Sequence, residues 1–384
     1  MGPLRGVRVL DLSMVVSGPF ATMMLADMGA DVIKIEPPEG DVMRINAQHR
    51  NGVPLGVLNW NRNKRGMVLD LKREGAIEVF MRMAEKSQVV VQNVRPGVVD
   101  RLGIGYDAVH RRNPKLVYCS ISGYGFSGPL MDKPAYDPII QGHAGAMFTQ
   151  TTQGRPRAVK NIIGDKVTGM TATISILGAL HEAERTGQGQ HLQLAMIDAL
   201  AYFLMGDTAG NHTFLPHEKG LKATMGTAEP YETADGYIVI AALTDKQWIA
   251  LTTAVGHPEW FEGPEPRHER TRRSGRNLIE LFKTKPSAYW LERIEAADVP
   301  CGVVNNYDTI WTDPQFVAND TFFEYEHPKA GRVRAVRFPA KMSETPTELW
   351  RHGPGLGEQT DEVLADLGFS SSEIANLRGA QIVK

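Results

Sequence analysis

Residues 7–122 alternate between short apolar runs and longer runs with helical spacing, and this alternation limits the fold more than any other feature of the chain. Residues 7–12 are typical of a buried strand, residues 20–29 of a helix that ends at a glycine, and residues 31–35 of a second strand. The pattern continues with a strand at 66–71, a helix at 73–86 and strands at 88–92 and 116–122. Such units pack as a mostly parallel sheet covered by helices, with ligands at the carboxyl ends of the strands. The sequence therefore predicts a large α/β domain.

A second, smaller α/β domain is expected after a polar segment at residues 212–227. Residues 236–243 predict a strand and residues 247–255 a helix, followed by a stretch at 256–276 that is crowded with Pro, His, Glu and Arg. Helices at 276–283 and 288–297 and a strand at 302–305 complete it, and two short helices at 360–367 and 371–378 end the chain. We expect a large domain from residues 1–222 and 330–384, with the small domain at 223–329.

Residues 161–198 contain the most prominent candidate for chemistry. Asp165 follows Gly164 and precedes a mostly apolar run at 167–180 that predicts a buried helix, which should end at the glycine-rich residues 186–189. A strand at 190–194 and a helix at 195–206 follow. An aspartate here usually caps its helix. Because this helix is poor in charge, Asp165 can also stand at the edge of an apolar wall as a nucleophile.

Charge and cysteine content exclude several classes of function. The 42 basic and 44 acidic residues give a net charge of -2, so the chain has no global basic field for nucleic acid or an anionic membrane. Cys119 and Cys301 lack the spacing of a zinc site or a disulfide framework, and we expect no metal. A reducing compartment, the cytoplasm, is the expected location, because we find neither a signal sequence nor a membrane-spanning run.

Three loops next to predicted strands are candidates for ligand binding. Residues 123–128 match the dinucleotide fingerprint G-x-G-x-x-G, but Pro129 and Pro134 follow where that fingerprint needs a helix, so we reject a nicotinamide site. This loop and residues 220–227 are instead candidates for elements that close over a site. Residues 59–66 and 93–105 carry Arg and Lys that either bind phosphate or lie in solvated turns.

The whole chain resembles the family III CoA-transferases, which include formyl-CoA and carnitine CoA-transferases and the related 2-methylacyl-CoA racemases. The resemblance rests on many blocks in order, among them RVLDLSMVVSGPFATMMLADMGADVIKIEPPEGD, NRNKRGMVLDLK, NVRPGVVDRLGIGYDAV, KPAYD, TGQGQHLQLAMIDA and GEQTDEVLADLGF. It implies a Rossmann-like large domain built from both ends of the chain, and an interlocked homodimer. It also implies that Asp165 is catalytic. The residues that it places along the coenzyme A site are Val16, Leu69, Lys72, Asn93, Val94, Arg95, Arg101, Tyr136 and Asp137.

The resemblance predicts transfer of CoA from an acyl-CoA to a carboxylic acid, with the thioester as substrate and no separate cofactor. A carboxylate that attacks a thioester gives a mixed anhydride and then an enzyme thioester, and both remain exchangeable where a serine ester would not. Formyl-CoA transferase has a Gln where this chain has Val16, which argues against formyl-CoA and oxalate as substrates.

Two alternatives remain open. A racemase of this fold places His before the Asp of the KPAYD-like block, but this chain has Tyr136 there, and His143 lies seven residues further on. The other is a CoA-binding protein without catalysis, which would not need Asp165.

Overall fold

The computed structural model describes residues 2–46, 48–215 and 229–384. It has two compact units, a large unit of Met1–Leu215 with Asp320–Lys384 and a small unit of Pro216–Asn319. The sequence placed the divisions after residues 222 and 329. The second division lies earlier because the hairpin of β12 (Phe322–His327) and β13 (Gly331–Val336) contacts the large unit, where Asn51 Nδ2 donates to the Lys329 carbonyl at 3.0 Å.

The large unit is built on a six-stranded sheet in the order β5-β2-β1-β6-β7-β8, and every neighbouring pair is parallel. The strands are β1 (Arg8–Asp11), β2 (Asp31–Glu36), β5 (Lys64–Val68), β6 (Val89–Gln92), β7 (Val117–Ser122) and β8 (His191–Ala195). Val9 pairs with both Val32 and Val89, so the first strand lies at the centre of the sheet. The predicted α/β fold with a parallel sheet is confirmed.

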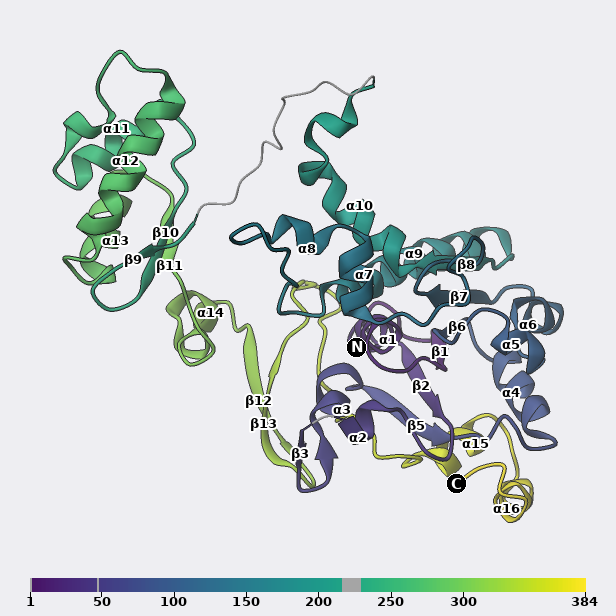
Figure 1. The fold of residues 1–384 in the computed structure, drawn as a ribbon. Helices are drawn as coiled ribbons and strands as arrows, with labels where there is room; N and C mark the ends of the chain where they lie inside the picture. The colour runs from purple at the N-terminus through teal and green to yellow at the C-terminus, as the bar shows by residue number, and fades with distance from the viewer. Residues whose placement is uncertain (1, 47, 216–228) are drawn as a thin grey trace. The chain divides into compact units, whose positions relative to one another are not determined.

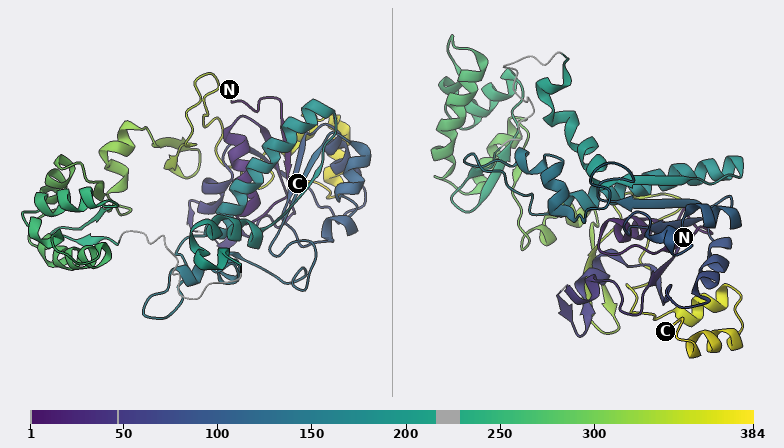
Figure 2. Two further views of the ribbon diagram at one scale, coloured as in Figure 1. Left: turned by 90° about the horizontal axis from the view of Figure 1, so that it is seen from above. Right: turned by 45° about the vertical axis from the view of Figure 1, so that its right-hand side comes forward.

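Helices cover both faces of this sheet (Figure 1). The face that carries Val9 and Val32 is covered by α1 (Ser17–Asp27), α7 (Asp137–His143), α9 (Ile163–Thr186) and α10 (Met196–Thr208). The face that carries Leu10 and Ile33 is covered by α4 (Ala76–Glu85), α6 (Tyr106–Arg112), α15 (Thr360–Asp366) and α16 (Ser371–Gly379). Residues from both ends of the chain therefore share one core, and Figure 2 shows α9 lying along the sheet.

α1 and α9 approach each other closely at Gly169. A Cβ atom added there would lie 2.8 Å from the Ser17 carbonyl oxygen and 2.9 Å from a ring carbon of Phe20. No larger residue fits without moving one helix, so glycine sets the spacing between the N-terminal turns of α1 and α9.

The small unit packs helices on an antiparallel sheet in the order β11-β10-β9, which are Cys301–Val303, Tyr237–Ile240 and Tyr231–Glu232. Its helices are α11 (Asp245–Ala254), α12 (Arg267–Phe282) and α13 (Ser287–Ala296), and its core is aromatic, with Trp248, Phe261, Phe282 and Trp290 buried. The helix predicted at 276–283 begins earlier than expected, because α12 starts at Arg267 within the stretch crowded with Pro, His, Glu and Arg. The first turns of α12 show no apolar periodicity in the sequence. Their side chains instead form ion pairs, Arg270 with Asp245 and Arg273 with Glu265.

Short elements connect these parts. They are α2 (Met43–Asn46), β3 (His49–Arg50), β4 (Val53–Pro54), α3 (Leu55–Trp60), α5 (Val98–Arg101), α8 (Ala146–Thr149), η1 (Gly210–Thr213), η2 (Pro258–Phe261), η3 (Ile310–Thr312) and α14 (Pro314–Ala318). In the part of the chain that the structure describes, none of the helices combines the length and the apolar character that crossing a membrane requires.

Candidate active site

Asp165 lies in the first turn of α9, as the sequence predicted, and its side chain is only 7% exposed. It does not cap its own helix. That role belongs to Asp137 at the start of α7, whose Oδ1 accepts the N–H groups of Gly164 at 2.7 Å and Asp165 at 3.2 Å. Gln141 Nε2 donates to the other oxygen of Asp137 at 2.7 Å. Because Asp137 caps the helix, the carboxylate of Asp165 is not needed to bind the N–H groups at the start of α9.

The environment of Asp165 raises the pKa of its carboxyl group to about 6. Burial is the main cause, and repulsion by the neighbouring Asp137 carboxylate adds to it. The hydroxyl and the backbone N–H of Ser17 both donate to Asp165 and act in the opposite direction. At pH 7 roughly nine-tenths of the groups are still ionised. A buried carboxylate that stays ionised near neutral pH suits a nucleophile.

Asp165 lines a cavity of about 360 Å³ at the carboxyl ends of β1, β6 and β7. Of the predicted coenzyme A residues, Asn93, Val94, Arg95 and Tyr136 line the same cavity. Ser17, Lys133 and Met196 also line it, and the sequence had not singled them out. This is the position at which parallel α/β sheets bind ligands.

A second cavity of about 230 Å³ adjoins the first, since Met14 and Val94 line both. Leu69 and Lys72 lie in its wall. The two cavities bring together most of the predicted coenzyme A residues along one edge of the sheet.

Three predicted coenzyme A residues line neither cavity. Val16 is buried at the N-cap of α1, between Val15 and Ser17, which do line the first cavity. Asp137 caps α9, and Arg101 is exposed at the end of α5, whose Val98 and Val99 line the second cavity.

The loop at residues 12–16, between β1 and α1, is held by buried charged side chains. Asp11, Lys34 and Lys64 are fully buried and Asp41 is 2% exposed. Lys64 Nζ lies 2.9 Å from Asp11 Oδ2, and Lys34 Nζ lies 3.1 Å from Asp41 Oδ2. Burial alone would raise the pKa of Asp11, but the charges of Lys64 and Lys34 and the hydrogen bonds that it accepts lower it below its usual value. Burial lowers the pKa of Lys64 to about 8 in spite of the neighbouring Asp11 charge, so the Lys64–Asp11 pair is still ionised near neutral pH.

These charges also bind the backbone of the loop. Lys34 Nζ donates to the Ser13 carbonyl at 2.9 Å, and the Asp41 carboxylate accepts the Val15 N–H at 3.2 Å. Asn93 accepts the Met14 N–H at 2.8 Å and donates to its carbonyl at 2.7 Å. Val15 has φ +69°, a conformation that a β-branched residue adopts only when its surroundings impose it. These hydrogen bonds therefore hold the loop in a single conformation.

The basic residues at 59–66 are neither phosphate ligands nor solvated turns. Arg62 pairs with Asp27 at 2.5 Å, Lys64 with Asp11, and Arg65 with Asp31 at 2.8 Å. The sequence alone could not reveal this, because the acidic partners lie far away along the chain. Lys34 and Asp11, each within a run predicted as a buried strand, were the available signals of an internal charge network.

The glycine-rich loop at 123–128 carries no dinucleotide site. Gly125 and Gly128 have φ +98° and +90°, and the described residues 123–136 contain no helix that could receive a pyrophosphate. Gly123 lines the Asp165 cavity, and a Cβ there would lie 2.4 Å from Ala135 Cβ. The other predicted closing segment, residues 220–227, lies outside the described residues.

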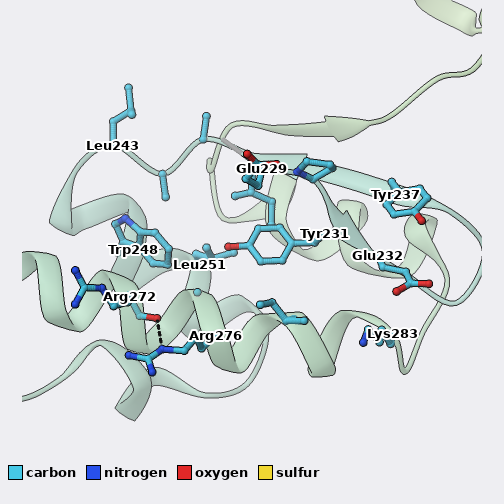
Figure 3. Close-up of a pocket in the computed structure, with 16 residues that line it drawn as sticks. Glu229, Tyr231, Glu232, Tyr237, Leu243, Trp248, Leu251, Arg272, Arg276 and Lys283 are labelled. Carbon is cyan, nitrogen blue, oxygen red and sulfur yellow. Dashed lines mark hydrogen bonds between the residues drawn. The ribbon is translucent and has the colours of Figure 1, made fainter. Parts of the chain in front are cut away.

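The small unit has a cavity of its own, of about 830 Å³ (Figure 3). Figure 3 shows the acidic Glu229 and Glu232 and the basic Arg272, Arg276 and Lys283 around Tyr231 and Trp248. None of the predicted site residues lines it. The smaller cavity at Asp165 is the better candidate, because it contains a buried carboxylate whose pKa is shifted toward neutrality.

Known proteins share both the sequence pattern and the fold. The model of one protein family, described as CoA-transferase family III, matches residues 4–360. The chain belongs to this family. The formyl-CoA:oxalate CoA-transferase of Streptomyces coelicolor is 34% identical, over 99% of this chain and 99% of its own length. The succinate–glutarate CoA-transferase of Agrobacterium fabrum is 33% identical, over 95% of this chain and 96% of its own.

The fold comparison agrees. The crystal structure of a CAIB/BAIF family protein from Brucella suis superposes with a TM-score of 0.83 at 28% identity and covers 95% of this chain and 99% of that one. The protein is thus a family III enzyme. Relatives named for oxalate and for glutarate are almost equally similar, so overall identity does not discriminate between these acids.

Proposed function

We propose that this family III enzyme transfers CoA from an acyl-CoA to a carboxylic acid, with Asp165 as the nucleophile. The observation that carries the proposal is the buried, unpaired carboxylate of Asp165 in a cavity at the carboxyl end of a parallel sheet. Among residues 2–46, 48–215 and 229–384, no Lys or Arg lies within ion-pair distance of it, and no basic side chain contributes to its pKa shift. A structural carboxylate in such a place would be expected to have a cation partner.

The reaction needs four steps at this carboxylate. Asp165 attacks the thioester carbonyl carbon, the carbon–sulfur bond breaks, and CoA leaves as the thiolate. The thiolate then attacks the Asp165 carbonyl carbon of the anhydride, which releases the donor acid and leaves an enzyme thioester. The acceptor carboxylate attacks this thioester and expels CoA again. The thiolate finally takes the new acyl group and restores Asp165.

We infer that coenzyme A lies along the two adjoining cavities. The nucleotide end fits the second cavity beside Leu69 and Lys72, whose ammonium group can meet a phosphate. The pantetheine arm would pass Val94 and Met14, which line both cavities, and carry the thioester to Asp165. In this arrangement Arg101 and Val16 do not contact coenzyme A directly. They lie beside residues that line the two cavities.

A racemase would need a second acid–base group besides Asp165, and no histidine is among the described residues that line the cavity. Tyr136 lines it but is 63% exposed. His143 is exposed, packs against the ring of Tyr124 at 5.3 Å and is not among the residues that line the cavity. Racemisation requires groups that exchange a proton on both faces of the α-carbon. A CoA-binding protein without catalysis would have no use for a desolvated Asp165, which costs stability.

We further propose that the active form is a homodimer. The large unit exposes apolar side chains on α8, α9, α10 and the segment after them: Phe148 (75%), Met170 (51%), Ile174 (68%), Tyr202 (91%), Phe203 (57%) and Leu215 (89%). A second copy of the chain would remove this surface from water. The cytoplasm is the compartment that we propose, since Cys119 and Cys301 are both free.

A transfer assay tests the proposal. The protein is incubated with succinyl-CoA and a panel of carboxylic acids that includes oxalate and glutarate, and new acyl-CoA species are identified by mass spectrometry. We expect CoA on at least one acid with the wild-type protein and none with Asp165→Asn. Equal transfer by the two proteins would contradict the proposed role of Asp165.

A further inference from the structure

A network of three hydrogen bonds crosses the parallel sheet from its edge strand to the two cavities near Asp165. His191 is the first residue of β8, and its Nε2 lies 2.9 Å from Ser120 Oγ on β7. Gln92, the last residue of β6, donates from Nε2 to the same Ser120 Oγ at 2.9 Å. Gln92 Oε1 accepts the Val94 N–H at 2.9 Å. The network therefore joins three neighbouring strands and ends at Val94, which lines both cavities.

The direction of each hydrogen bond in this network follows from its Val94 end. A backbone N–H can only donate, so the atom that accepts it is the amide oxygen of Gln92, and the amide nitrogen faces Ser120. Ser120 Oγ thus accepts from Gln92, and its own hydrogen completes the contact with His191 Nε2. In this arrangement His191 is neutral and carries its proton on Nδ1.

The packing around His191 holds the ring in place. The aromatic rings that surround it are Tyr106 at 4.7 Å, Tyr118 at 5.6 Å and Phe126 at 6.5 Å between ring centroids. Burial lowers the pKa of His191 below its usual value, although the charges of Asp100 and Asp107 act in the opposite direction. The ring is therefore neutral at pH 7, as the network requires.

We propose that His191 is a positioning residue for coenzyme A binding. It acts through Ser120 and Gln92, which hold the turn that ends at Val94. The inference rests on the proposed function, in which the pantetheine arm passes Val94, and deepens it. His191 itself lines neither cavity. Its lone pair fixes the hydroxyl of Ser120, this hydroxyl fixes the amide of Gln92, and the turn then has its binding geometry before the ligand arrives.

Loss of the acceptor on His191 would disturb the whole network. Ser120 and Gln92 are each only 2% exposed, so water would not readily replace a missing partner. Protonation of His191 has the same effect, because Nε2 then becomes a donor and the Ser120 hydrogen loses its acceptor. Coenzyme A should therefore bind more weakly when His191 is protonated or lacks an acceptor.

The test measures binding of free coenzyme A by titration calorimetry at pH 7.5 and pH 5. His191→Phe keeps an aromatic ring beside Tyr106 but removes the acceptor, whereas His191→Gln keeps an acceptor that does not titrate. Ser120→Ala removes the central hydroxyl. The matched control is His110→Phe, because His110 also packs on Tyr106, at 5.1 Å, but its Nδ1 has no hydrogen-bond partner among the described residues. Thermal unfolding checks that each variant is folded.

At pH 7.5 we expect the dissociation constants of His191→Phe and Ser120→Ala to rise about 5- to 30-fold, because each leaves a buried polar group without its partner. The double variant should bind no more weakly than either single variant, since one network is broken in all three. His191→Gln and His110→Phe should bind like wild type. Between pH 7.5 and pH 5 wild type should lose more affinity than His191→Gln, because only the histidine gains a proton.

Three results would overturn the proposal. The first is a folded His191→Phe protein that binds coenzyme A as tightly as wild type. The second is a His191→Gln protein that binds as weakly as His191→Phe, which would assign the loss to packing. The third is an equal loss of affinity at pH 5 by wild type and His191→Gln, which would contradict the requirement for a neutral ring. Failure of wild type itself to bind coenzyme A would instead overturn the proposed function.

Discussion

Replacing Asp165 by Asn should make the protein more stable above pH 6. The pKa of this carboxyl rises from 3.8 to about 6 on folding, mainly because burial disfavours its charge. Each pKa unit corresponds to about 1.4 kcal/mol, so roughly two units make the ionised side chain cost about 3 kcal/mol of folding free energy. This cost is absent below pH 3.8, where both states are protonated. It grows as the pH rises and is complete above pH 6.

Asn keeps the shape of the side chain but carries no charge. Thermal and urea unfolding of wild type and Asp165→Asn at pH 8 and pH 4 measure the difference. We expect the variant to be about 2 to 4 kcal/mol more stable at pH 8, with most of the gain lost at pH 4. Asp137→Ala is the comparison variant, and it should lose about 1 to 2 kcal/mol because it removes the carboxylate that caps α9. An Asp165→Asn protein that is no more stable than wild type at pH 8 would refute the reasoning.

Three further outcomes are expected. Lys64→Met should lower the free energy of unfolding by about 3 to 5 kcal/mol in urea, because it leaves Asp11 charged and buried without Lys64, whereas Lys341→Met at an exposed position should have little effect. The protein should sediment as a dimer on dilution to nanomolar concentration and dissociate only where its secondary structure melts, and a folded monomer would argue against the interlocked assembly. In deuterated water a 2-methylacyl-CoA should keep its α-proton, and rapid exchange without an acceptor acid would favour the racemase.

Local sequence patterns predicted the parts of the fold that depend on local spacing. The strands at 7–12 and 31–35 and the glycine after the helix between them are visible as apolar periodicity and a chain reversal, and the structure has β1, β2 and α1 there. Asp165 could be placed in the first turn of its helix because the apolar run and the closing Gly187 fix both ends of α9.

Contacts between distant residues could not be predicted in the same way. The capping of α9 is carried out by Asp137, which lies 28 residues before Asp165 and binds the N–H groups of the helix. The basic residues Arg62 and Lys64 meet Asp27 and Asp11 only after the sheet has formed. Ser17 reads as an ordinary residue before a Gly-Pro turn, and only the crossing of α1 and α9 at Gly169 brings it to Asp165.

The most direct test of the account is chemical capture of the enzyme intermediate. Wild-type protein is incubated with succinyl-CoA, treated with hydroxylamine or borohydride, digested and sequenced by mass spectrometry. We predict modification at Asp165, in the peptide at the start of α9, and none in Asp165→Asn. Turnover of succinyl-CoA with an unmodified Asp165 peptide, or modification at another carboxylate, would contradict the central claim.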